Sequence, residues 1–290
     1  MSDNSSQAAG IYRRCIGDAL VTVVNDGYLD VPVSILHGAE ADEIQATLEQ
    51  SFAPATPRIA VNAFVVEIGG RRILIDAGGG ATTVASMGRL IDNLGHAGYR
   101  TRDFGTVLLT HIHPDHSSGL LDADLKPLFP EAEIIVHKDE LEFWTSADVR
   151  DGVIPAAKPY IGSARALMQA YGGQFRAIDG GEIMPGLSQL PLPGHTPGHS
   201  GYVLKSAGES LLIWGDTVHI PELQIPIPGV TSEFDISEDT AAESRRKLFR
   251  HVADEKLLVT GGHLHLPGFA HLLRNGDDYR LVPEAWKVTL

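Results

Sequence analysis

The sequence predicts an α/β protein in which two β-sheets pack together and helices cover them from outside. Strand-like and helix-like segments recur in two similar halves of the chain, and no linker-like composition separates the halves. The 290 residues, 43% of them hydrophobic, are enough to bury a substantial core. We therefore expect residues 11–290 to form one domain, preceded by a disordered tail of small and polar residues at 1–10.

The elements of the first half follow from hydrophobic spacing and turn residues. In order, they are a strand at residues 19–24 that ends at the turn signal Asn25-Asp26-Gly27, an amphipathic helix at 39–52, a hairpin of strands at 63–68 and 71–76, and a helix from about 82 to 97. The Gly-rich stretch Asp76 to Gly80 precedes the last helix and could cradle a phosphate. It lacks both GxGxxG spacing and a P-loop lysine, so we favour a tight turn near an active site, with Asp76 making loop hydrogen bonds.

The rest of the chain follows the same rules, and its second, strand-rich half begins after Gly180-Gly181. It contains a helix that begins near Ser117 and Ser118, a strand at 133–137, a short helix at 138–146, a helical region within 151–175, strands at 187–192, 201–205 and 210–214, a helix at 238–254 and a strand at 257–260. The serines at 117 and 118, and Ser237 before the late helix, are suited to capping helix N-termini.

Composition excludes several classes of function. The formal net charge of −14 argues against DNA or RNA as the main partner. Cys15 is the single cysteine, so the chain can form neither an intrachain disulfide nor a thiolate metal site. The first ten residues lack the apolar region of a signal peptide, and no later stretch has the apolar length of a membrane span. We expect a cytoplasmic protein without membrane or nucleic-acid partners.

The most informative stretch is His111-Ile-His113-Pro-Asp115-His116, which follows a short buried strand. In an extended segment, His111 and His113 project to the same side and can reach one ion. Pro114 then turns the chain, which allows Asp115 and His116 to face a second position. A solvated, His-rich loop is the alternative, but imidazole and carboxylate groups at this density indicate a metal site.

Further metal-type side chains follow three other apolar strands, namely His195, Asp216 and His263. The count predicts two divalent ions, zinc or alternatively manganese, iron or cobalt. We expect His111, His113 and His195 to bind one ion and Asp115, His116 and His263 the other, with Asp216 bridging them. Two such cations would lower the pKa of a shared water molecule and produce a bridging hydroxide, and Asp115 or Asp216 could relay its proton. No Gly-x-Ser-x-Gly elbow is present to suggest a serine nucleophile.

This set of seven residues resembles the full dinuclear pattern of the metallo-β-lactamase superfamily. The resemblance covers residues 60–281 and implies an αβ/βα four-layer sandwich with the metals at one sheet edge. Within the superfamily, the sequence most resembles the methyl parathion hydrolase branch and, more distantly, the acyl-homoserine lactonases. The stretches that carry it are Thr110 to Leu120, Glu142-Phe-Trp, Gly194-His-Thr-Pro-Gly-His, Gly215-Asp216 and Tyr279-Arg-Leu-Val-Pro. The resemblance also makes His199 a structural loop residue, and it suggests a homodimer.

The residues around the predicted metal site are expected to determine which substrate is bound. His219 lies three residues after Asp216, where the related lactonases have a tyrosine and the parathion-hydrolase branch an apolar residue. It is either catalytic, by donating a hydrogen bond to an oxyanion or protonating a leaving group, or a pocket residue without a chemical role. Phe143, Trp144 and Tyr160 are either an aromatic substrate pocket or simply core. His265 could compete with His263 as a ligand, but His263 directly follows the strand, so we expect His265 to lie beside the ligands or in the pocket. The Pro-rich loop 220–228 is expected to be a substrate mouth or a dimer contact.

These expectations favour a dinuclear metal-dependent hydrolase that attacks an ester-like bond in a small hydrophobic substrate. The bond would belong to a lactone, an aryl or alkyl ester, or an organophosphate triester. Acyl-homoserine lactonase is the alternative specific activity. The acidic charge disfavours a nuclease or phosphodiesterase, and an oxygenase would need a single iron or an added flavin module. A catalytically inactive binding protein on the same fold would be expected to lack ligands, whereas all seven are present.

Overall fold

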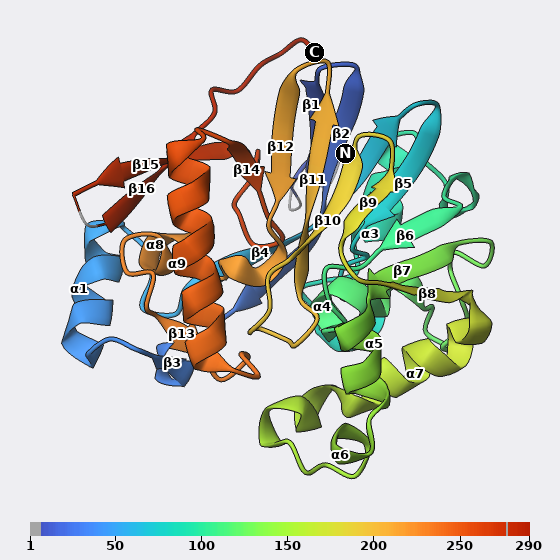
Figure 1. The fold of residues 1–290 in the computed structure, drawn as a ribbon, viewed down its shortest axis with the longest axis horizontal. Coiled ribbons are helices and arrows are strands. Elements are labelled where there is room, and N and C mark those ends of the chain that lie inside the picture. The colour runs from blue at the N-terminus through green and yellow to red at the C-terminus, as the bar shows by residue number, and fades with distance from the viewer. Residues whose placement is uncertain (1–6, 277) are drawn as a thin grey trace, which may run out of the picture.

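Two β-sheets form the centre of the protein (Figure 1). The computed structural model describes residues 7–276 and 278–290, and each sheet has seven strands within these residues. The first sheet has the spatial order β1 (Ile11–Ile16), β2 (Ala19–Asp30), β4 (Arg58–Ile68), β5 (Arg71–Ile75), β6 (Thr106–Leu108), β7 (Glu133–His137) and β8 (Phe175–Ile178). The second has the order β16 (Asp278–Pro283), β15 (Ala270–Asn275), β14 (Leu258–Thr260), β12 (Glu209–Ile213), β11 (Ser200–Ser206), β10 (Leu187–Pro191) and β9 (Gly181–Met184).

Strand direction determines where the loops emerge. In the first sheet, β5, β6, β7 and β8 run parallel, with Leu74 beside Val107 and Leu108 beside Ile135. In the second sheet, β12 and β14 are also parallel. Since the carboxyl ends of parallel strands lie at one edge of a sheet, the segments that follow β12 and β14 leave from the same edge. Those segments, together with the one that follows β6, carry most of the predicted metal ligands.

Side chains alternate between the two faces of each sheet. On β4, Phe64 and Val66 belong to the core between the sheets, whereas Ala63 and Val65 face the helices outside. On β12, Leu211 and Ile213 likewise face the core between the sheets. This period-two pattern is the one that identified the strands in the sequence, and it buries both faces of each sheet.

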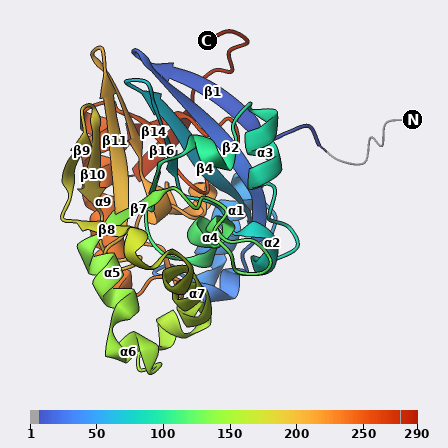
Figure 2. The ribbon, with the colours of Figure 1, turned by 90° about the vertical axis from the view of Figure 1, so that its right-hand side faces the viewer.

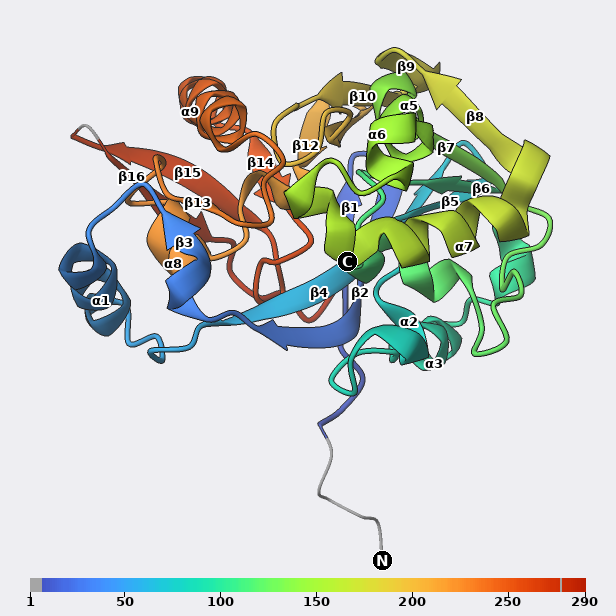
Figure 3. The same ribbon diagram turned by 90° about the horizontal axis from the view of Figure 1, so that it is seen from below.

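Helices cover both outer faces, so the architecture is the predicted αβ/βα four-layer sandwich (Figures 2 and 3). The helices are α1 (Ala41–Gln50), α2 (Gly80–Thr83), α3 (Leu90–His96), α4 (Pro114–Ser117), α5 (Lys138–Thr145), α6 (Ala147–Arg150), α7 (Ile161–Tyr171), α8 (Pro221–Gln224) and α9 (Glu238–Asp254). Helices α3, α5 and α7 pack on the first sheet, α6 packs on α5, and α9 packs on the second sheet. A short ribbon of β3 (Leu36–His37) and β13 (Thr231–Ser232) lies beside α1 and α8.

Two boundaries differ from the prediction in the first half. The turn predicted at Asn25-Asp26-Gly27 is wrong, because β2 continues through it with a bulge between Asn25 and Gly27. The carboxylate of Asp26 is buried there and accepts hydrogen bonds from the backbone N–H groups of Gly79 (2.9 Å) and Leu90 (2.8 Å). The predicted single helix at 82–97 is in fact α2 and α3, because the chain becomes extended after α2.

Helix capping also differs from the prediction. Helix α4 begins at Pro114 rather than at Ser117, so Asp115 and His116 lie on a helix instead of in a loop. Ser237 occupies the N-cap position of α9, but its hydroxyl pairs with Thr240 Oγ1 (2.8 Å) rather than with a backbone N–H.

Residues 1–6 of the predicted N-terminal tail lie outside the described residues, and residues 7–10 form no helix or strand. Among the residues that the structure describes, no helix has both the length and the apolar character needed to cross a membrane.

Candidate metal centre

The seven predicted ligands meet at one end of the sandwich, although they come from four separate parts of the chain. His111 and His113 follow β6, Asp115 and His116 lie on α4, His195 follows β10, Asp216 lies in the 3₁₀ turn Gly215–Thr217 after β12, and His263 follows β14. Six of these side chains are buried, and Asp115 is partly exposed. The segments that follow these strands therefore place all seven predicted ligands at one site.

The first group consists of His111, His113 and His195, each of which offers one ring nitrogen within 4.8 Å of the others. Nε2 of His195 lies 3.2 Å from His111 Nε2 and 2.8 Å from His113 Nδ1. Burial lowers the pKa of His111 and of His113 well below the ordinary value, so both rings are neutral and keep a lone pair for a cation.

The second group consists of Asp115, His116, Asp216 and His263. His116 Nε2 lies 3.3 Å from Asp115 Oδ2 and 3.1 Å from Asp216 Oδ1. Asp216 Oδ2 lies 3.1 Å from His263 Nε2 and 3.5 Å from His195 Nε2. One carboxylate therefore faces both groups, as a bridging ligand requires.

The side chains present fit two divalent cations. His116 Nε2 and Asp216 Oδ1 are fully buried, and neither has a hydrogen-bond partner despite their short separation. Burying unpaired polar atoms is costly, and a cation coordinated by both would remove that cost. Burial alone would raise the pKa of Asp216, but His116 and His263 lower that pKa well below its usual range and keep the group a carboxylate.

In three of the predicted ligand rings, the ring nitrogen that faces away from the centre contacts another part of the protein. Asp76 Oδ2 lies 2.9 Å from His116 Nδ1, Asp235 Oδ1 lies 2.9 Å from His195 Nδ1, and His263 Nδ1 donates to the Ala60 carbonyl at 2.7 Å. Such contacts fix which ring nitrogen carries the proton and leave the other free to coordinate. Asp76 has a left-handed backbone (φ 59°) and also accepts from the N–H of Thr110, so it makes the loop hydrogen bonds predicted for it.

Glu140, on α5, is a central residue that the sequence reasoning missed. Its buried carboxylate accepts hydrogen bonds from the Ile112 N–H (2.8 Å), the Trp144 indole (2.7 Å), the Thr196 hydroxyl (2.5 Å) and the Gly198 N–H (3.2 Å). It therefore joins the loop of His111 and His113 to the loop of His195. A Cβ at position 198 would collide with the Glu140 backbone, which explains that glycine.

His199 has a structural role. Its Nδ1 donates to the Leu192 carbonyl (2.7 Å), and its Nε2 accepts from the Asp216 N–H (2.8 Å). Burial lowers the pKa of His199 to about 3, consistent with a neutral ring that makes both bonds. Because both nitrogens are occupied, His199 positions Asp216.

A pocket of about 200 Å³, which we call the inner pocket, opens over the predicted ligands. Its lining comprises five of the ligands together with Leu29, Ile59, Thr83, Pro114, Tyr160, His219 and Phe234. The Tyr160 ring lies 4.5 Å from that of His113. Burial and the charges of Asp115 and Glu233 raise the pKa of Tyr160 to about 12, so its phenol remains a hydrogen-bond donor.

His219 lies inside the inner pocket and is almost fully buried. Its Nε2 is 3.3 Å from Asp216 Oδ2, yet neither ring nitrogen has a hydrogen-bond partner in the described protein. Its backbone is fixed instead, because Gln224 Oε1 accepts from the His219 N–H at 2.6 Å. The free ring nitrogens are therefore available to a bound molecule.

The other predicted pocket residues lie elsewhere. Trp144 is buried in the core, with its indole N–H committed to Glu140, and Phe143 packs against it with ring centroids 5.1 Å apart. His265 is half-exposed and pairs with Glu222, with 3.0 Å between Nε2 and Oε1. None of these three lines the inner pocket.

The sequence profile of the metallo-beta-lactamase superfamily matches residues 56–263. An N-acyl homoserine lactonase from Bacillus sp. is 25% identical over 182 residues, which are 60% of this chain and 62% of the relative. An atrochrysone carboxyl ACP thioesterase from Passalora fulva is 28% identical over 158 residues, 54% of this chain. This chain spans only 38% of the length of the thioesterase.

Two solved structures resemble the protein over nearly its whole length. The hydrolase AbOPH, of the beta lactamase superfamily, superimposes with a TM-score of 0.91 at 30% identity. AidC, a dizinc quorum-quenching lactonase in complex with the product N-hexanoyl-L-homoserine, gives a TM-score of 0.91 at 25% identity. Each comparison covers 97% of this chain and 100% of the other.

Proposed function

The chain belongs to the metallo-beta-lactamase superfamily, and from this premise we propose that it is a dinuclear metal-dependent hydrolase of ester-like bonds. The observation that carries the proposal is Asp216, whose two oxygens face two buried groups of donors beneath a pocket. We propose zinc as the metal in both groups, with manganese, iron or cobalt as alternatives. The substrate is a lactone, an aryl or alkyl ester, or an organophosphate triester.

The reaction adds a water oxygen to the carbonyl or phosphoryl centre and breaks the bond to the leaving oxygen. Two divalent cations, when bound by the seven ligands, would acidify a water molecule and withdraw electron density from the substrate oxygen. Asp115, the one partly exposed ligand, or Asp216 accepts the water proton and passes it to the leaving oxygen. His219 donates a hydrogen bond to the oxygen that gains charge, since its ring nitrogens have no protein partner.

The walls of the inner pocket support an uncharged reacting group. Leu29, Ile59, Pro114 and Phe234 are apolar, and the pocket lining contains no lysine or arginine among the described residues. An anionic phosphodiester would find no counter-charge there besides the metals. Acyl-homoserine lactonase is a second, more specific candidate, which the likeness to AidC and to the Bacillus lactonases supports.

The proposal is tested by metal analysis combined with a parallel screen of lactones, aryl esters and phosphotriesters. We expect two equivalents of metal per chain, hydrolysis that stops on chelation, and recovery when metal is restored. His263→Gln should lose an equivalent of metal, whereas His251→Gln, at an exposed site on α9, should keep both. Fewer than two equivalents in the unaltered protein, or full hydrolysis after chelation, would show that the proposal is wrong.

A further inference from the structure

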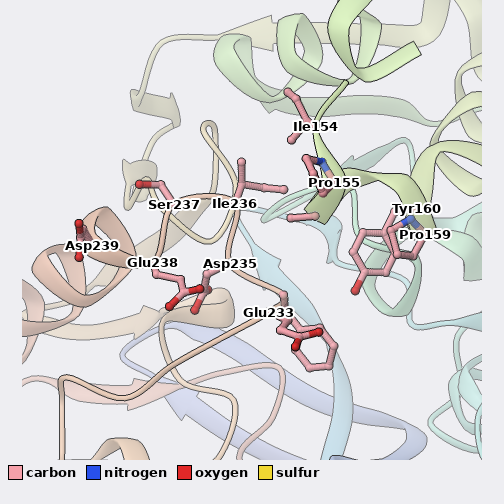
Figure 4. A pocket seen from close by; sticks show the side chains of 12 residues that line it. Ile154, Pro155, Pro159, Tyr160, Glu233, Asp235, Ile236, Ser237, Glu238 and Asp239 are labelled. Atoms are coloured by element: carbon pink, nitrogen blue, oxygen red, sulfur yellow. The ribbon is translucent and has the colours of Figure 1, made fainter. Parts of the chain in front are cut away.

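A second and larger hollow adjoins the inner pocket, and we call it the outer cavity (Figure 4). Its volume is about 840 Å³. One side is formed by the 3₁₀ turn Pro155–Tyr160 and Ile154 before it, and the other by residues 233–239. Tyr160 and Phe234 line both the outer cavity and the inner pocket, so the two spaces meet at these side chains.

The inner pocket is too small to hold most substrates completely. Pockets for small molecules usually have volumes of roughly 300–1,000 Å³. The inner pocket, at about 200 Å³, can accept the reacting bond and little more, whereas the outer cavity is within the usual range. A substrate with its ester over the metal ligands would therefore extend past Tyr160 and Phe234.

The walls of the outer cavity differ in character. Ile154, Pro155 and Pro159 make one side apolar, and Ile236 adds an apolar side chain across from them. The segment 233–239 also supplies four carboxyl groups, whereas the described lining contains no lysine or arginine. The cavity thus combines apolar surface with one sign of charge.

Two of these four carboxylates are already used by the protein. Asp235 accepts from His195, and Glu238 is bonded to His37 (2.9 Å) and to the Thr231 hydroxyl (2.9 Å). Glu233 and Asp239 are exposed and form no ion pair within the described residues. Their charge therefore acts on whatever enters the outer cavity.

We propose that the outer cavity receives the non-reacting group of the substrate and that Glu233 and Asp239 restrict this group to uncharged or cationic chemistry. The inference rests on the proposed hydrolase function and deepens it. A carboxylate or phosphate about 7 Å from one of these groups in water would be disfavoured by about threefold, and an anionic group placed at that distance from both would be disfavoured by about tenfold. Apolar and cationic groups escape this repulsion.

Matched aryl acetates test the proposal on the metal-loaded protein. The para substituent is tert-butyl, its cationic isostere trimethylammonium, or carboxylate, and phenyl acetate serves as a reference small enough for the inner pocket. We expect kcat/KM for the carboxylate ester to be about tenfold below that of the tert-butyl ester. Glu233→Gln and Asp239→Asn should each reduce this discrimination about threefold, and the double variant should reduce it most, leaving only the repulsion of Asp235 and Glu238. Added salt should weaken it as well, because the two groups are exposed.

The matched control is Glu255→Gln, which removes a charge at the opposite end of α9 from Asp239 and should leave the discrimination unchanged. Calorimetric binding of the corresponding acetanilides, which carry the same substituents on an amide, repeats the comparison without turnover. Equal kcat/KM for the carboxylate and tert-butyl esters, or a discrimination in the double variant as large as that of the unaltered protein, would overturn the inference. Failure to hydrolyse any ester or lactone, with the binding preference intact, would overturn only the hydrolase function.

Discussion

Nδ1 of His195 donates a hydrogen bond to Oδ1 of Asp235, 2.9 Å away, while Nε2 of the same ring faces His111 and His113. Both side chains are buried. Asp235 therefore holds His195 in the tautomer and orientation that a metal ligand needs. Burial raises the pKa of Asp235, but the pairing with His195 lowers this pKa below its usual range. The contact therefore favours the carboxylate form of Asp235.

Replacing Asp235 by asparagine should weaken metal binding. We expect Asp235→Asn to lower the affinity of the first group of ligands by about 10- to 100-fold, because the ring loses its charged partner. Competition with a chromophoric chelator measures this affinity directly. Glu233→Gln, two residues away and exposed, is the control and should bind metal as the unaltered protein does. Equal affinity in both variants would show that Asp235 does not position His195.

Replacing Glu140 should destabilise the protein as well as the centre. In Glu140→Gln, an amide nitrogen would face some of the four donors that now point at a carboxylate. We expect the free energy of unfolding of the metal-free protein to fall by roughly 1.5–3 kcal/mol, as measured by urea denaturation. The control is Glu142→Gln, on the exposed face of α5, where we expect little change. Similar losses in the two variants would contradict the proposed role.

His219→Phe separates a catalytic role from a structural one. We expect kcat to fall about 100-fold, as when one preorganised donor to an oxyanion is removed, while two equivalents of metal remain bound. His265→Phe is the comparison, because His265 lies outside the inner pocket and pairs with Glu222. Unchanged rates for every substrate in His219→Phe would leave His219 as a pocket residue without a chemical role.

The pair of Arg14 and Glu284 predicts a dependence of stability on pH. Arg14 Nε and Nη2 contact the Glu284 carboxylate at 2.9 and 3.0 Å. Burial opposes the effect, but Arg14 lowers the pKa of Glu284 below its ordinary value. An acid whose pKa is lowered by folding contributes stability above its unfolded pKa, about 4.3, and this contribution is lost as the pH falls through the folded pKa.

Glu284→Gln should therefore cost up to about 1 kcal/mol of unfolding free energy at neutral pH and progressively less below about pH 4. Urea denaturation at several pH values measures this loss. Glu209→Gln removes a more exposed and more distant partner of Arg14 (3.6 Å) and should have a smaller effect. A cost for Glu284→Gln that is the same at pH 7 and pH 3 would contradict the assignment.

The strands and the ligand pattern could be predicted from the sequence because their signals are local. Val107 and Leu108 form part of a short apolar run, and His111 and His113 follow at a spacing that already places them on one side of the chain. The same holds for Asp216 after β12 and His263 after β14. Residue type and position relative to a strand end were sufficient to place these groups together.

Apart from Asp76, the residues that support the predicted ligands could not be predicted, because their roles depend on contacts between distant segments. Glu140 lies on an amphipathic helix among other acidic residues, and nothing in its neighbourhood distinguishes it from an exposed glutamate. Its partners Ile112 and Thr196 are 28 and 56 residues away. The bulge at Asp26 is a similar case. Its sequence predicts a turn, but the chain continues as a strand there, and the buried Asp26 carboxylate accepts hydrogen bonds from the N–H groups of Gly79 and Leu90, which are distant in the sequence.

The segment that forms one wall of the outer cavity is also attached to His195, a proposed metal ligand. Besides the bond from His195 to Asp235, the N–H of Ile236 donates to the His195 carbonyl and that of Ser237 to the Gly194 carbonyl, both at 2.9 Å. A ligand against Phe234 and Ile236 and a cation on His195 therefore act on one short piece of backbone. Such coupling is reciprocal. If a bound metal ion raises the affinity of the outer cavity for a ligand by some factor, that ligand raises the affinity for the metal ion by the same factor.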